Sequence, residues 1–152
     1  MGREFENLRL DNQLCFALYA ATHSITRIYR PLLAKYKITY PQYIVLLVLI
    51  ECHESTVNGI AEALKLDAAT VTPLLKRLAE ADWITRERSR QDERVVVVKL
   101  APKGYELANN LVTIQNEVRC RTRLDDSAFT RLKGEIIKLT ETLDISTKSE
   151  YS

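Results

Sequence analysis

The clearest pattern of hydrophobic and polar positions lies between Leu66 and Leu100. Its first part carries apolar residues at helical spacing, which places them on one face: Val71, Leu74, Leu75 and Leu78. The opposite face carries small, polar and basic residues: Ala69, Thr72, Pro73, Lys76 and, on its flank, Arg77. A charged turn then separates the segment Trp83–Arg88 from the β-branched run Val95–Val98. This second part predicts a two-stranded hairpin.

A short helix and a tight turn precede this amphipathic helix. Ser55 or Thr56 can cap the short helix, whose apolar residues are Ile60, Ala61 and Leu64. Three turn residues, 65–67, then lead into the next helix. This spacing is typical of a helix-turn-helix motif.

Pro73 allows two starting points for the second helix of the motif. If Asp67 is the cap, the proline falls in the second turn and costs about 3 kcal/mol through a lost hydrogen bond and a steric clash. If Thr72 is the cap, the proline falls at the permitted first position. We expect the helix to begin at Asp67, because Val71 already belongs to its apolar face.

Two longer helices are predicted before the motif. The first spans about 11–36, with Asp11 or Asn12 as its cap and a bend or interruption at Pro31. Its predicted core face carries Leu14, Leu18, Ile25 and Leu32. The second spans about 41–53 and has a proline in its first turn. Because this second segment is apolar nearly all round, we expect it in the core.

Two helices are also predicted after the hairpin. Pro102 begins the first, which has Leu107, Leu111, Ile114 and Val118 in register. Residues 125–127 cap the second, whose apolar residues recur in steps of three and four: Phe129, Leu132, Ile136, Leu139 and Leu143. This heptad-like spacing suits packing against a partner chain. Burial of the same residues within one subunit fits the spacing almost as well.

A helix followed by a hairpin whose tip holds Arg88, Arg90 and Arg94 is typical of a winged helix-turn-helix. Such a helix fits the major groove of DNA, which is about 12 Å wide, while the hairpin reaches the adjacent backbone or minor groove. The alternative is a small α+β domain with a solvated hairpin, and this window of the sequence alone does not decide between them.

Length and composition set limits on these interpretations. A chain of 152 residues suits one domain, and few Gly and Pro among many Leu, Ile and Val favour a mainly helical fold. The net charge is only +2, so DNA contacts would depend on locally placed charge. No apolar run approaches the length of a transmembrane helix. The first residues lack the apolar core of a signal peptide, so we expect a cytoplasmic protein, located at the nucleoid when bound to DNA.

The three cysteines, Cys15, Cys52 and Cys120, are an odd number at wide spacing, which argues against a disulfide scaffold or a zinc site. In a cytoplasmic protein they would be reduced. His23 and His53 lack partners at metal-ligand spacing, so we expect no metal and no cofactor. We interpret Cys52 as a small buried or half-buried residue of the second helix.

One face of the first helix carries Cys15, Tyr19 and Thr22, one and two turns apart. Tyr29 lies on the same face but 14 residues after Cys15, which is about 21 Å along a straight helix. The two side chains cannot meet within one helix, so a contact between them needs a second subunit. The alternative is an inert cysteine on an apolar helix face.

The order of elements and the wing residues Asp92-Glu93-Arg94 before the valine run resemble the MarR family of dimeric bacterial repressors. Within it, the sequence is similar to the organic-hydroperoxide-sensing repressors (OhrR type) of the two-cysteine kind. The matching segments are LDNQLCFALY (10–19), YRPLL (29–33), ITYPQY (38–43) and TVTPLLKR (70–77). The likeness spans about residues 8–104 and weakens in the last two helices. Ile50 stands where a Trp is expected, which would alter packing rather than sensing.

This resemblance implies a role for each residue of the sensor. Cys15 would sense the hydroperoxide, in a pocket formed with Tyr19, Tyr29 and Tyr40. In the family, the residues that match Tyr29 and Tyr40 come from the partner subunit, which agrees with the helix length given above. Cys120 would be the resolving cysteine that forms a disulfide with Cys15 of the other subunit.

The recognition helix and the wing would supply the DNA contacts. Ala69, Thr72, Pro73 and Lys76 would face the bases, with Thr70 and Arg77 nearer the phosphates. In the wing, Arg94 would enter the minor groove and Asp92 would hold it. Arg86 and Arg88 would lie along the DNA backbone. The alternative for these arginines is a solvated hairpin.

We therefore expect a mainly α protein with a small β-hairpin wing: a winged helix-turn-helix with N- and C-terminal dimerisation helices, in a single domain, 1–152. The dimerisation helices would occupy about 8–40 and 102–145, and the DNA-binding region about 41–101. The predicted function is a homodimeric repressor, not an enzyme, that releases a pseudo-palindromic operator when an organic hydroperoxide oxidises Cys15.

Two other functions stay open. A MarR-like repressor could respond to a small aromatic ligand, with Cys15 structural. A thiol peroxidase would need catalytic turnover with a reductant, and the sequence has no Cys-x-x-Cys motif and no Ser–His or Cys–His arrangement to support it.

Overall fold

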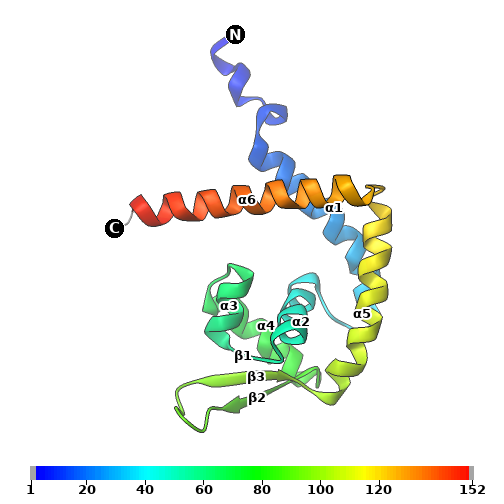
Figure 1. The fold of residues 1–152 in the computed structure, drawn as a ribbon, viewed down its shortest axis with the longest axis vertical. Helices are drawn as coiled ribbons and strands as arrows, with labels where there is room; N and C mark the ends of the chain where they lie inside the picture. The colour runs from blue at the N-terminus through cyan, green and yellow to red at the C-terminus, as the bar shows by residue number, and fades with distance from the viewer. Residues whose placement is uncertain (1–2, 151–152) are drawn as a thin grey trace. The chain divides into compact units, whose positions relative to one another are not determined.

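The computed structural model describes residues 3–150 of the chain (Figure 1). Within this range six α-helices and three short strands form, which confirms the mainly helical fold. Two 3-10 helices, Arg3–Leu8 and Leu10–Asn12, come before them. The chain divides into two compact units, Met1–Gln115 and Asn116–Ser152. None of the helices in the described part of the chain combines the length and the apolar character that crossing a membrane requires.

The six helices and three strands follow one another in a simple order. The helices are α1 (Leu14–Ala34), α2 (Tyr40–Cys52), α3 (Val57–Leu64), α4 (Ala68–Glu80), α5 (Pro102–Arg121) and α6 (Asp126–Glu150). The strands are β1 (Glu54–Thr56), β2 (Ile84–Arg88) and β3 (Val96–Leu100). In the first unit α2 contacts α3, α4 and β3, and the hairpin β2–β3 follows α4 directly.

Caps define the helix-turn-helix formed by α3 and α4. Thr56 caps α3 by accepting a hydrogen bond from the Gly59 N–H at 3.0 Å. Lys65 adopts a left-handed conformation that ends α3. Asp67 caps α4 by accepting from the Thr70 N–H at 2.6 Å. The predicted start of α4 at Asp67, with the proline inside the helix, is therefore confirmed.

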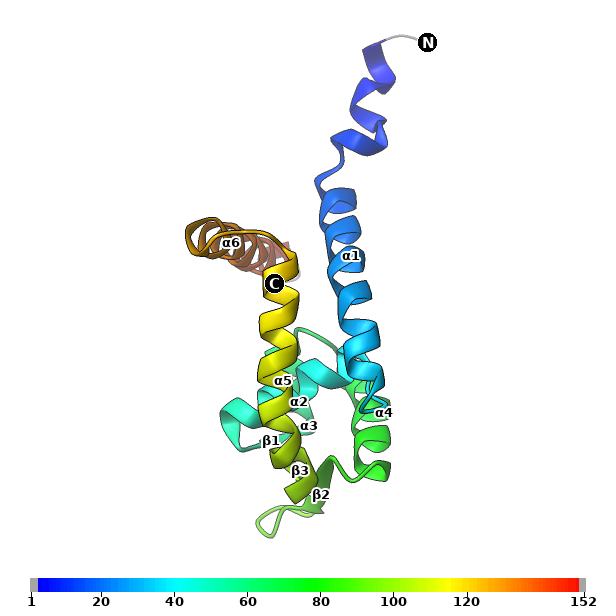
Figure 2. The same cartoon turned by 90° about the vertical axis from the view of Figure 1, so that its right-hand side faces the viewer.

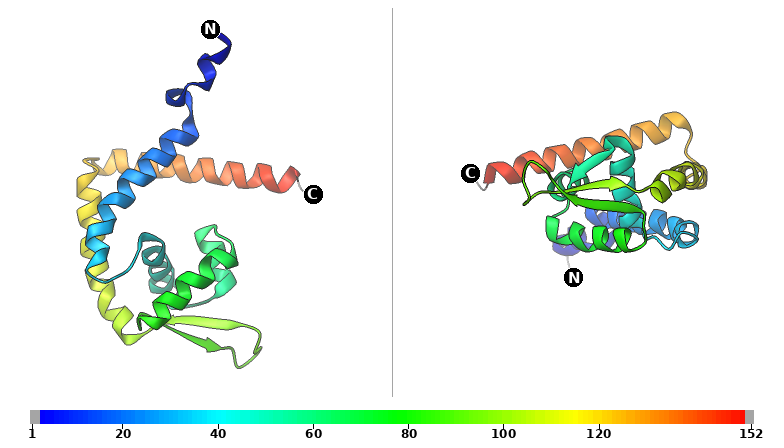
Figure 3. Two further views of the ribbon diagram at one scale, coloured as in Figure 1. Left: turned by 180° about the vertical axis from the view of Figure 1, so that it is seen from behind. Right: turned by 90° about the horizontal axis from the view of Figure 1, so that it is seen from below.

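The sheet has three antiparallel strands in the order β1–β3–β2, not the two that the sequence predicts. β2 and β3 form the expected hairpin, with Ile84 opposite Leu100, and their loop projects from the sheet (Figure 3). β1 adds to β3, with Glu54 opposite Lys99 and an ion pair of 2.8 Å between the two side chains. A strand of three residues is too short to show alternation, which is why the sequence pattern does not reveal it.

The first turn of α5 packs closely on the segment that leads into β2. A Cβ atom added at Gly104 would lie 2.3 Å from the carbonyl oxygen of Trp83. The neighbouring Lys103 donates to the Ala81 carbonyl at 2.8 Å, and its ammonium lies 4.1 Å from the Trp83 ring centroid. Only glycine allows the two backbones to approach this closely.

α1 is one continuous helix that starts three residues later than expected (Figure 2). Neither Asp11 nor Asn12 caps it, because both belong to the second 3-10 helix. Gln13 occupies the cap position and makes no side-chain cap hydrogen bond. The helix also continues through Pro31, so the predicted interruption does not occur.

The core of the first unit combines side chains from α1 to α4 and β3. Its fully buried members are Leu33, Val45, Leu46, Leu49, Ile60, Val71, Leu75, Leu78 and Val98. The predicted core position of α2 is confirmed by its buried residues. The predicted core face of α1 is wrong at Leu14 and Ile25, which are 62% and 40% exposed. Helical spacing identifies the apolar face of a helix but not what covers it.

The two C-terminal helices begin where the sequence predicts. In α5 the four apolar residues in register are buried: Leu107, Leu111, Ile114 and Val118. Asp125 caps α6 by accepting from the Ala128 N–H at 2.8 Å. Arg119 pairs with Asp126 and lies over the Phe129 ring at 4.3 Å. Large apolar side chains of α6 remain exposed in the single chain: Leu132, Ile136, Ile137, Leu143 and Ile145.

Candidate functional site

α4 separates a buried apolar face from an exposed polar one. Val71, Leu75 and Leu78 are fully buried, and Leu74 is half-buried. All six positions predicted to face DNA are exposed: Ala69, Thr70, Thr72, Pro73, Lys76 and Arg77. Lys76 lies 4.0 Å from Glu80, one turn further on. The exposed side of α4 therefore presents a methyl group, hydroxyls and two cations to solvent.

Pro73 changes the backbone of that face. Proline has no N–H, so the carbonyl of Ala69 lacks the donor that would normally close this turn of the helix. One residue earlier, the Thr72 hydroxyl donates to the Ala68 carbonyl at 2.7 Å. The first turns of α4 therefore carry fewer backbone hydrogen bonds than a regular helix, on the side that faces solvent.

The tip of the hairpin is organised by Asp92. Its carboxylate accepts from the Arg94 N–H at 3.0 Å and lies 4.0 Å from the Arg94 Nε. Its carbonyl accepts from the Val95 N–H at 2.9 Å, which closes a turn and delays the start of β3 to Val96. The Arg94 side chain is 95% exposed. Asp92 thus fixes the backbone from which this solvent-exposed guanidinium projects.

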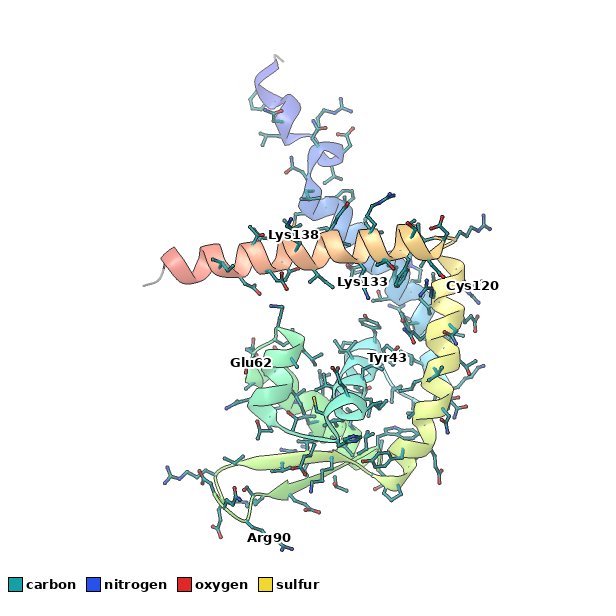
Figure 4. The ribbon with its side chains drawn as sticks, in the orientation of Figure 1. Tyr43, Glu62, Arg90, Cys120, Lys133 and Lys138 are labelled. Carbon is teal, nitrogen blue, oxygen red and sulfur yellow. The ribbon has the colours of Figure 1, made fainter. Side chains whose placement is uncertain are left out.

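Further arginines surround this tip. Arg86 and Arg88 are exposed on β2, and Arg88 donates to the Glu93 carbonyl at 3.4 Å. Arg90 lies on the loop between the strands (Figure 4). The predicted concentration of positive charge at the hairpin tip is therefore present, although the net charge of the chain is only +2.

Cys15 lies in the first turn of α1, and its side chain is exposed. One turn further along, Tyr19 is 61% exposed, and its ring centroid lies 4.3 Å from that of His23, with the two rings tilted by 56°. Because α1 is continuous from Leu14 to Ala34, its geometry places Tyr29 about 21 Å from Cys15. The structure does not bring these two predicted sensor residues together within one chain.

Tyr29 and Tyr40, in contrast, do meet within one chain. Their ring centroids lie 5.0 Å apart, with Tyr29 on α1 and Tyr40 at the start of α2. A third ring, Tyr43, completes the group at 5.1 Å from Tyr29 and 5.8 Å from Tyr40. We call these three residues the tyrosine cluster.

Burial and mutual proximity change the acidity of the cluster. Burial, with a smaller contribution from Tyr29, raises the pKa of Tyr40 above its usual value. Burial also raises the pKa of Tyr43, followed by the effects of Tyr29 and Tyr40. Both hydroxyls therefore stay protonated and able to donate at neutral pH. Tyr43 was not among the predicted site residues, although its position three residues after Tyr40 on a helix places the two on one face.

A capping box fixes the start of α2 and with it the position of Tyr40. The Gln42 side chain accepts from the Thr39 N–H at 2.8 Å, and Thr39 in turn caps the helix. A cavity of about 430 Å³ lies beside this turn, lined by His23, Thr26, Arg30, Ala34, Ile38, Thr39, Tyr40 and Pro41. Its lining combines apolar surface with one guanidinium and one imidazole.

The other two cysteines are also exposed and free. Cys120 lies near the C-terminal end of α5, and Cys52 ends α2. The prediction that Cys52 is buried or half-buried is wrong, because it sits in the last turn of α2, beyond the buried part of that helix. Among the residues that the structure describes, no three His, Cys, Asp or Glu side chains gather as a metal site would require.

Comparisons with known proteins show that this chain is similar to transcriptional regulators over most of its length. A family described as transcriptional regulator SarA/Rot matches residues 27–111, more than half of the chain. The organic hydroperoxide resistance transcriptional regulator of Bacillus subtilis (strain 168) is 41% identical over 143 residues, which cover 94% of this chain and 97% of that protein. The similarity therefore includes the segments that carry Cys15, the tyrosine cluster and the winged helix.

Solved structures match the fold. Reduced AbfR bound to DNA has a TM-score of 0.77 at 33% identity, covering 91% of this chain and 95% of its own. Disulfide-formed AbfR has a TM-score of 0.64 at 33% identity, with coverage of 94% and 95%; AbfR comes from Staphylococcus epidermidis. Bordetella bronchiseptica BpsR, whose DNA binding is regulated by 6-hydroxynicotinic acid, has a TM-score of 0.77 at 22% identity, covering 84% and 98%. These likenesses confirm the winged-helix fold.

Proposed function

This chain belongs to the MarR family of transcriptional regulators, and from that premise we propose that it is a homodimeric repressor controlled by organic hydroperoxides. Oxidation of Cys15 would release the repressor from a pseudo-palindromic operator. The protein would act in the cytoplasm as a stoichiometric switch and not as an enzyme. Support comes from the 41% identity with the Bacillus subtilis organic hydroperoxide resistance regulator.

One observation carries the proposal: the two parts of the sensor lie at opposite ends of one helix. Cys15 is exposed in the first turn of α1, and the Tyr29–Tyr40 pair lies near its end. In a two-fold symmetric dimer, the partner's Tyr29 and Tyr40 can reach Cys15 of this chain. By symmetry, Tyr29 and Tyr40 of this chain then reach the partner's Cys15. Tyr19, one turn from Cys15 and exposed, would line the same pocket.

The chemistry follows from these groups. A thiolate attacks a peroxide, whereas an ordinary cysteine ionises only near pH 8.5. Hydroxyls from the partner's Tyr29 and Tyr40 that donate to the sulfur would favour the thiolate, and their rings would form an apolar wall suited to organic hydroperoxides. The sulfur bonds to the terminal oxygen, the O–O bond breaks, and the alkoxide leaves as an alcohol after taking up a proton. Cys15 is left as a sulfenic acid.

Cys120 of the other subunit would resolve this intermediate. Its sulfur bonds to the Cys15 sulfur, and the hydroxyl leaves as water with the thiol proton. A disulfide holds its two Cα atoms about 5.5–6 Å apart, so its formation constrains the helices that carry the cysteines. The accessibility of both thiols supports this step. So does the similarity to AbfR, which has been solved in a disulfide-formed state.

DNA binding would use α4 and the wing of each subunit. Ala69, Thr72, Pro73 and Lys76 would face bases in the major groove, with Thr70 and Arg77 at the phosphates. Arg94, held by Asp92, would enter the minor groove, and Arg86 and Arg88 would follow the backbone. Two half-sites one turn apart are separated by about 34–36 Å. A small change in the spacing of the two α4 helices would therefore prevent both from binding at once.

Dimerisation would use the exposed apolar faces of the terminal helices. Leu14 and Ile25 on α1 and Leu132, Ile136 and Leu143 on α6 are all exposed in the single chain. Their burial in a homodimer would bring the sensor parts of two chains together. Release of DNA would then follow from any oxidation that changes how these helices pack.

A binding titration tests the proposal. DNA from upstream of the protein's own gene is titrated with three samples. These are the reduced protein, the protein treated with cumene hydroperoxide, and the treated protein after addition of dithiothreitol. We expect binding, loss of binding and recovery. Cys15→Ser should bind and ignore the peroxide, whereas the control Cys52→Ser should behave as wild type. A Cys15→Ser protein that still releases DNA with peroxide contradicts the sensor assignment. A non-reducing gel shows whether Cys120 cross-links the subunits.

A second function has one specific observation in its favour. The cavity of about 430 Å³ beside Tyr40 has apolar walls and contains Arg30, which suits a small aromatic acid. Repression relieved by such a ligand would leave Cys15 structural, and BpsR, a protein of the same fold, responds to 6-hydroxynicotinic acid. Release of DNA from Cys15→Ser by an aromatic acid, lost again in a Cys15→Ser/Arg30→Ala protein, would favour this function.

A further inference from the structure

Pro73 leaves one backbone carbonyl of α4 without its usual partner. Pro73 lies inside α4, the second helix of the helix-turn-helix (Figure 1). In an α-helix the carbonyl of residue 69 accepts from the N–H of residue 73, and proline has no N–H. The neighbouring Thr72 hydroxyl does not replace this donor, because it donates to the Ala68 carbonyl at 2.7 Å. The Ala69 carbonyl is therefore available to a donor from outside the helix.

This carbonyl lies on the exposed side of α4. Ala69 and Pro73 are one turn apart and both exposed, whereas Val71 and Leu75 are fully buried. Carbonyls on the solvent side of a helix tilt outward, and a proline ring crowds the carbonyl four residues before it. The acceptor therefore belongs to the surface that the proposed function places against DNA.

The major groove offers two donors to such an acceptor. They are the N6 amine of adenine and the N4 amine of cytosine, whereas guanine and thymine present only acceptors there, apart from the thymine methyl group. A carbonyl that faces another acceptor loses its water without gaining a partner, which is unfavourable. An unpaired carbonyl in the groove would therefore favour a base that carries an amine and disfavour the others.

We propose that the Ala69 carbonyl contributes directly to sequence recognition, by accepting a hydrogen bond from the exocyclic amine of one base in each half-site. This inference rests on the proposed function, because it requires α4 to lie in the major groove. The Ala69 methyl and the Pro73 ring favour adenine over cytosine: they are exposed apolar groups beside the carbonyl, and an A·T pair presents the thymine methyl on the same edge as the adenine amine.

Pro73→Ala closes this turn of the helix, because alanine supplies the missing N–H to the Ala69 carbonyl. Alanine is also the better helix former, so the thermal midpoint should not fall. A loss of affinity alone would not identify the carbonyl, since the proline ring is lost as well. The test is therefore a double-mutant cycle, in which the protein loses the unpaired acceptor and the DNA loses the amine.

The cycle uses the DNA from upstream of the protein's own gene, with its half-sites located by footprinting. Each adenine is replaced in turn, in both half-sites, by 2-aminopurine, which pairs with thymine but carries no amine in the major groove. Each cytosine is replaced by 2-pyrimidinone, which lacks the N4 amine. All titrations use reduced protein at one salt concentration. We expect one adenine whose replacement weakens binding of wild type about tenfold but that of Pro73→Ala less than about twofold.

Pro41→Ala is the matched control. Pro41 lies in the first turn of α2, where an N–H has no partner within the helix, so this exchange closes no turn. The variant should keep the tenfold effect. The same pattern at a cytosine supports the contact and assigns it to the N4 amine.

The outcomes distinguish this inference from the proposed function. Equal losses in wild type and Pro73→Ala at every replaced base overturn the carbonyl contact. Specific binding of the unmodified fragment would then leave the proposed DNA-binding function standing without it. If the reduced wild type does not prefer this fragment to unrelated DNA, the proposed function itself fails, and the inference about the Ala69 carbonyl fails with it.

Discussion

The winged-helix region and the terminal helices use the same kind of apolar stripe in different ways. In α4, Val71 and Leu75 are fully buried by other parts of the same chain. In α1 and α6, Ile25 and Leu132 are 40% and 48% exposed. An amphipathic sequence therefore predicts that a face will be covered, but not by which chain.

The same difference separates the two proposed functional surfaces. The exposed face of α4 and the arginine-bearing hairpin are complete in one chain, since every residue predicted to contact DNA is exposed there. The proposed sensor is incomplete in one chain, because Cys15 lies in the first turn of α1 and Tyr29, the member of the tyrosine cluster on the same helix, lies about 21 Å further along it. Four experiments test how the two regions differ.

The largest effect is expected for Leu75→Ala, in the buried face of α4. Truncating a fully buried leucine costs about 2–5 kcal/mol of the free energy of unfolding. The matched change Leu132→Ala removes a half-exposed leucine of α6 and should cost less in the single chain. Its cost should also grow with protein concentration if a partner covers the site. Urea denaturation at several protein concentrations measures both losses. Equal losses that do not depend on protein concentration would contradict the difference between the two faces.

A charge in the exposed face of α6 should weaken a dimer rather than the fold. Ile136→Asp would bury an unpaired carboxylate in each copy, and we expect the dimer dissociation constant to rise at least about tenfold, equivalent to about 1.4 kcal/mol. Sedimentation equilibrium measures it. Thr130→Asp, at an exposed polar position of the same helix, serves as the control. An unchanged dissociation constant for Ile136→Asp would remove this face from the interface.

The close approach of α5 to the Trp83 backbone allows a paired glycine test. Gly104→Ala would place a Cβ 2.3 Å from the Trp83 carbonyl oxygen, so we expect a loss of about 1–3 kcal/mol from overpacking. Gly134→Ala meets no atom within 4 Å and should stabilise α6 by up to about 1 kcal/mol through helix propensity. We expect the thermal midpoint to fall in Gly104→Ala and to rise in Gly134→Ala, each relative to wild type. Two shifts in the same direction would contradict it.

The smallest effect concerns the cap of α4. Hydrogen bonds from Thr70 lower the pKa of Asp67 below its usual value. A carboxyl with a lowered pKa stabilises the fold fully above the pKa of the unfolded chain, about 3.9, and less as the pH falls through the folded-state pKa. The difference in thermal midpoint between wild type and Asp67→Ala should thus be constant near neutrality and shrink in acid. Asparagine caps a helix without titrating. The difference in thermal midpoint between Asp67→Asn and Asp67→Ala should therefore not shrink in acid.

Local patterns predict the winged helix well, because its determinants lie close together in the sequence. The stripe through Val71 and Leu75, the cap at Asp67 and the strand signals of the hairpin each lie within one element. Strand β1 is different, because its three residues form a strand only by pairing with β3, more than 40 residues away in the sequence. Tyr43 is different again: its spacing from Tyr40 places both on one face of α2, but in so apolar a helix the same spacing also fits a core residue.

The length of α1 between Cys15 and Tyr29 has a genetic consequence if the sensor is shared between subunits. Each dimer would contain two sensors, each built from one chain's sulfur and the other chain's phenols. A cell with one Cys15→Ser allele and one Tyr29→Phe allele would then form mixed dimers in which one of the two sensors is entirely wild type and the other is doubly defective. The mixed dimers would keep one intact sensor, which neither homodimer has, and they could not keep it if each chain carried its own complete sensor.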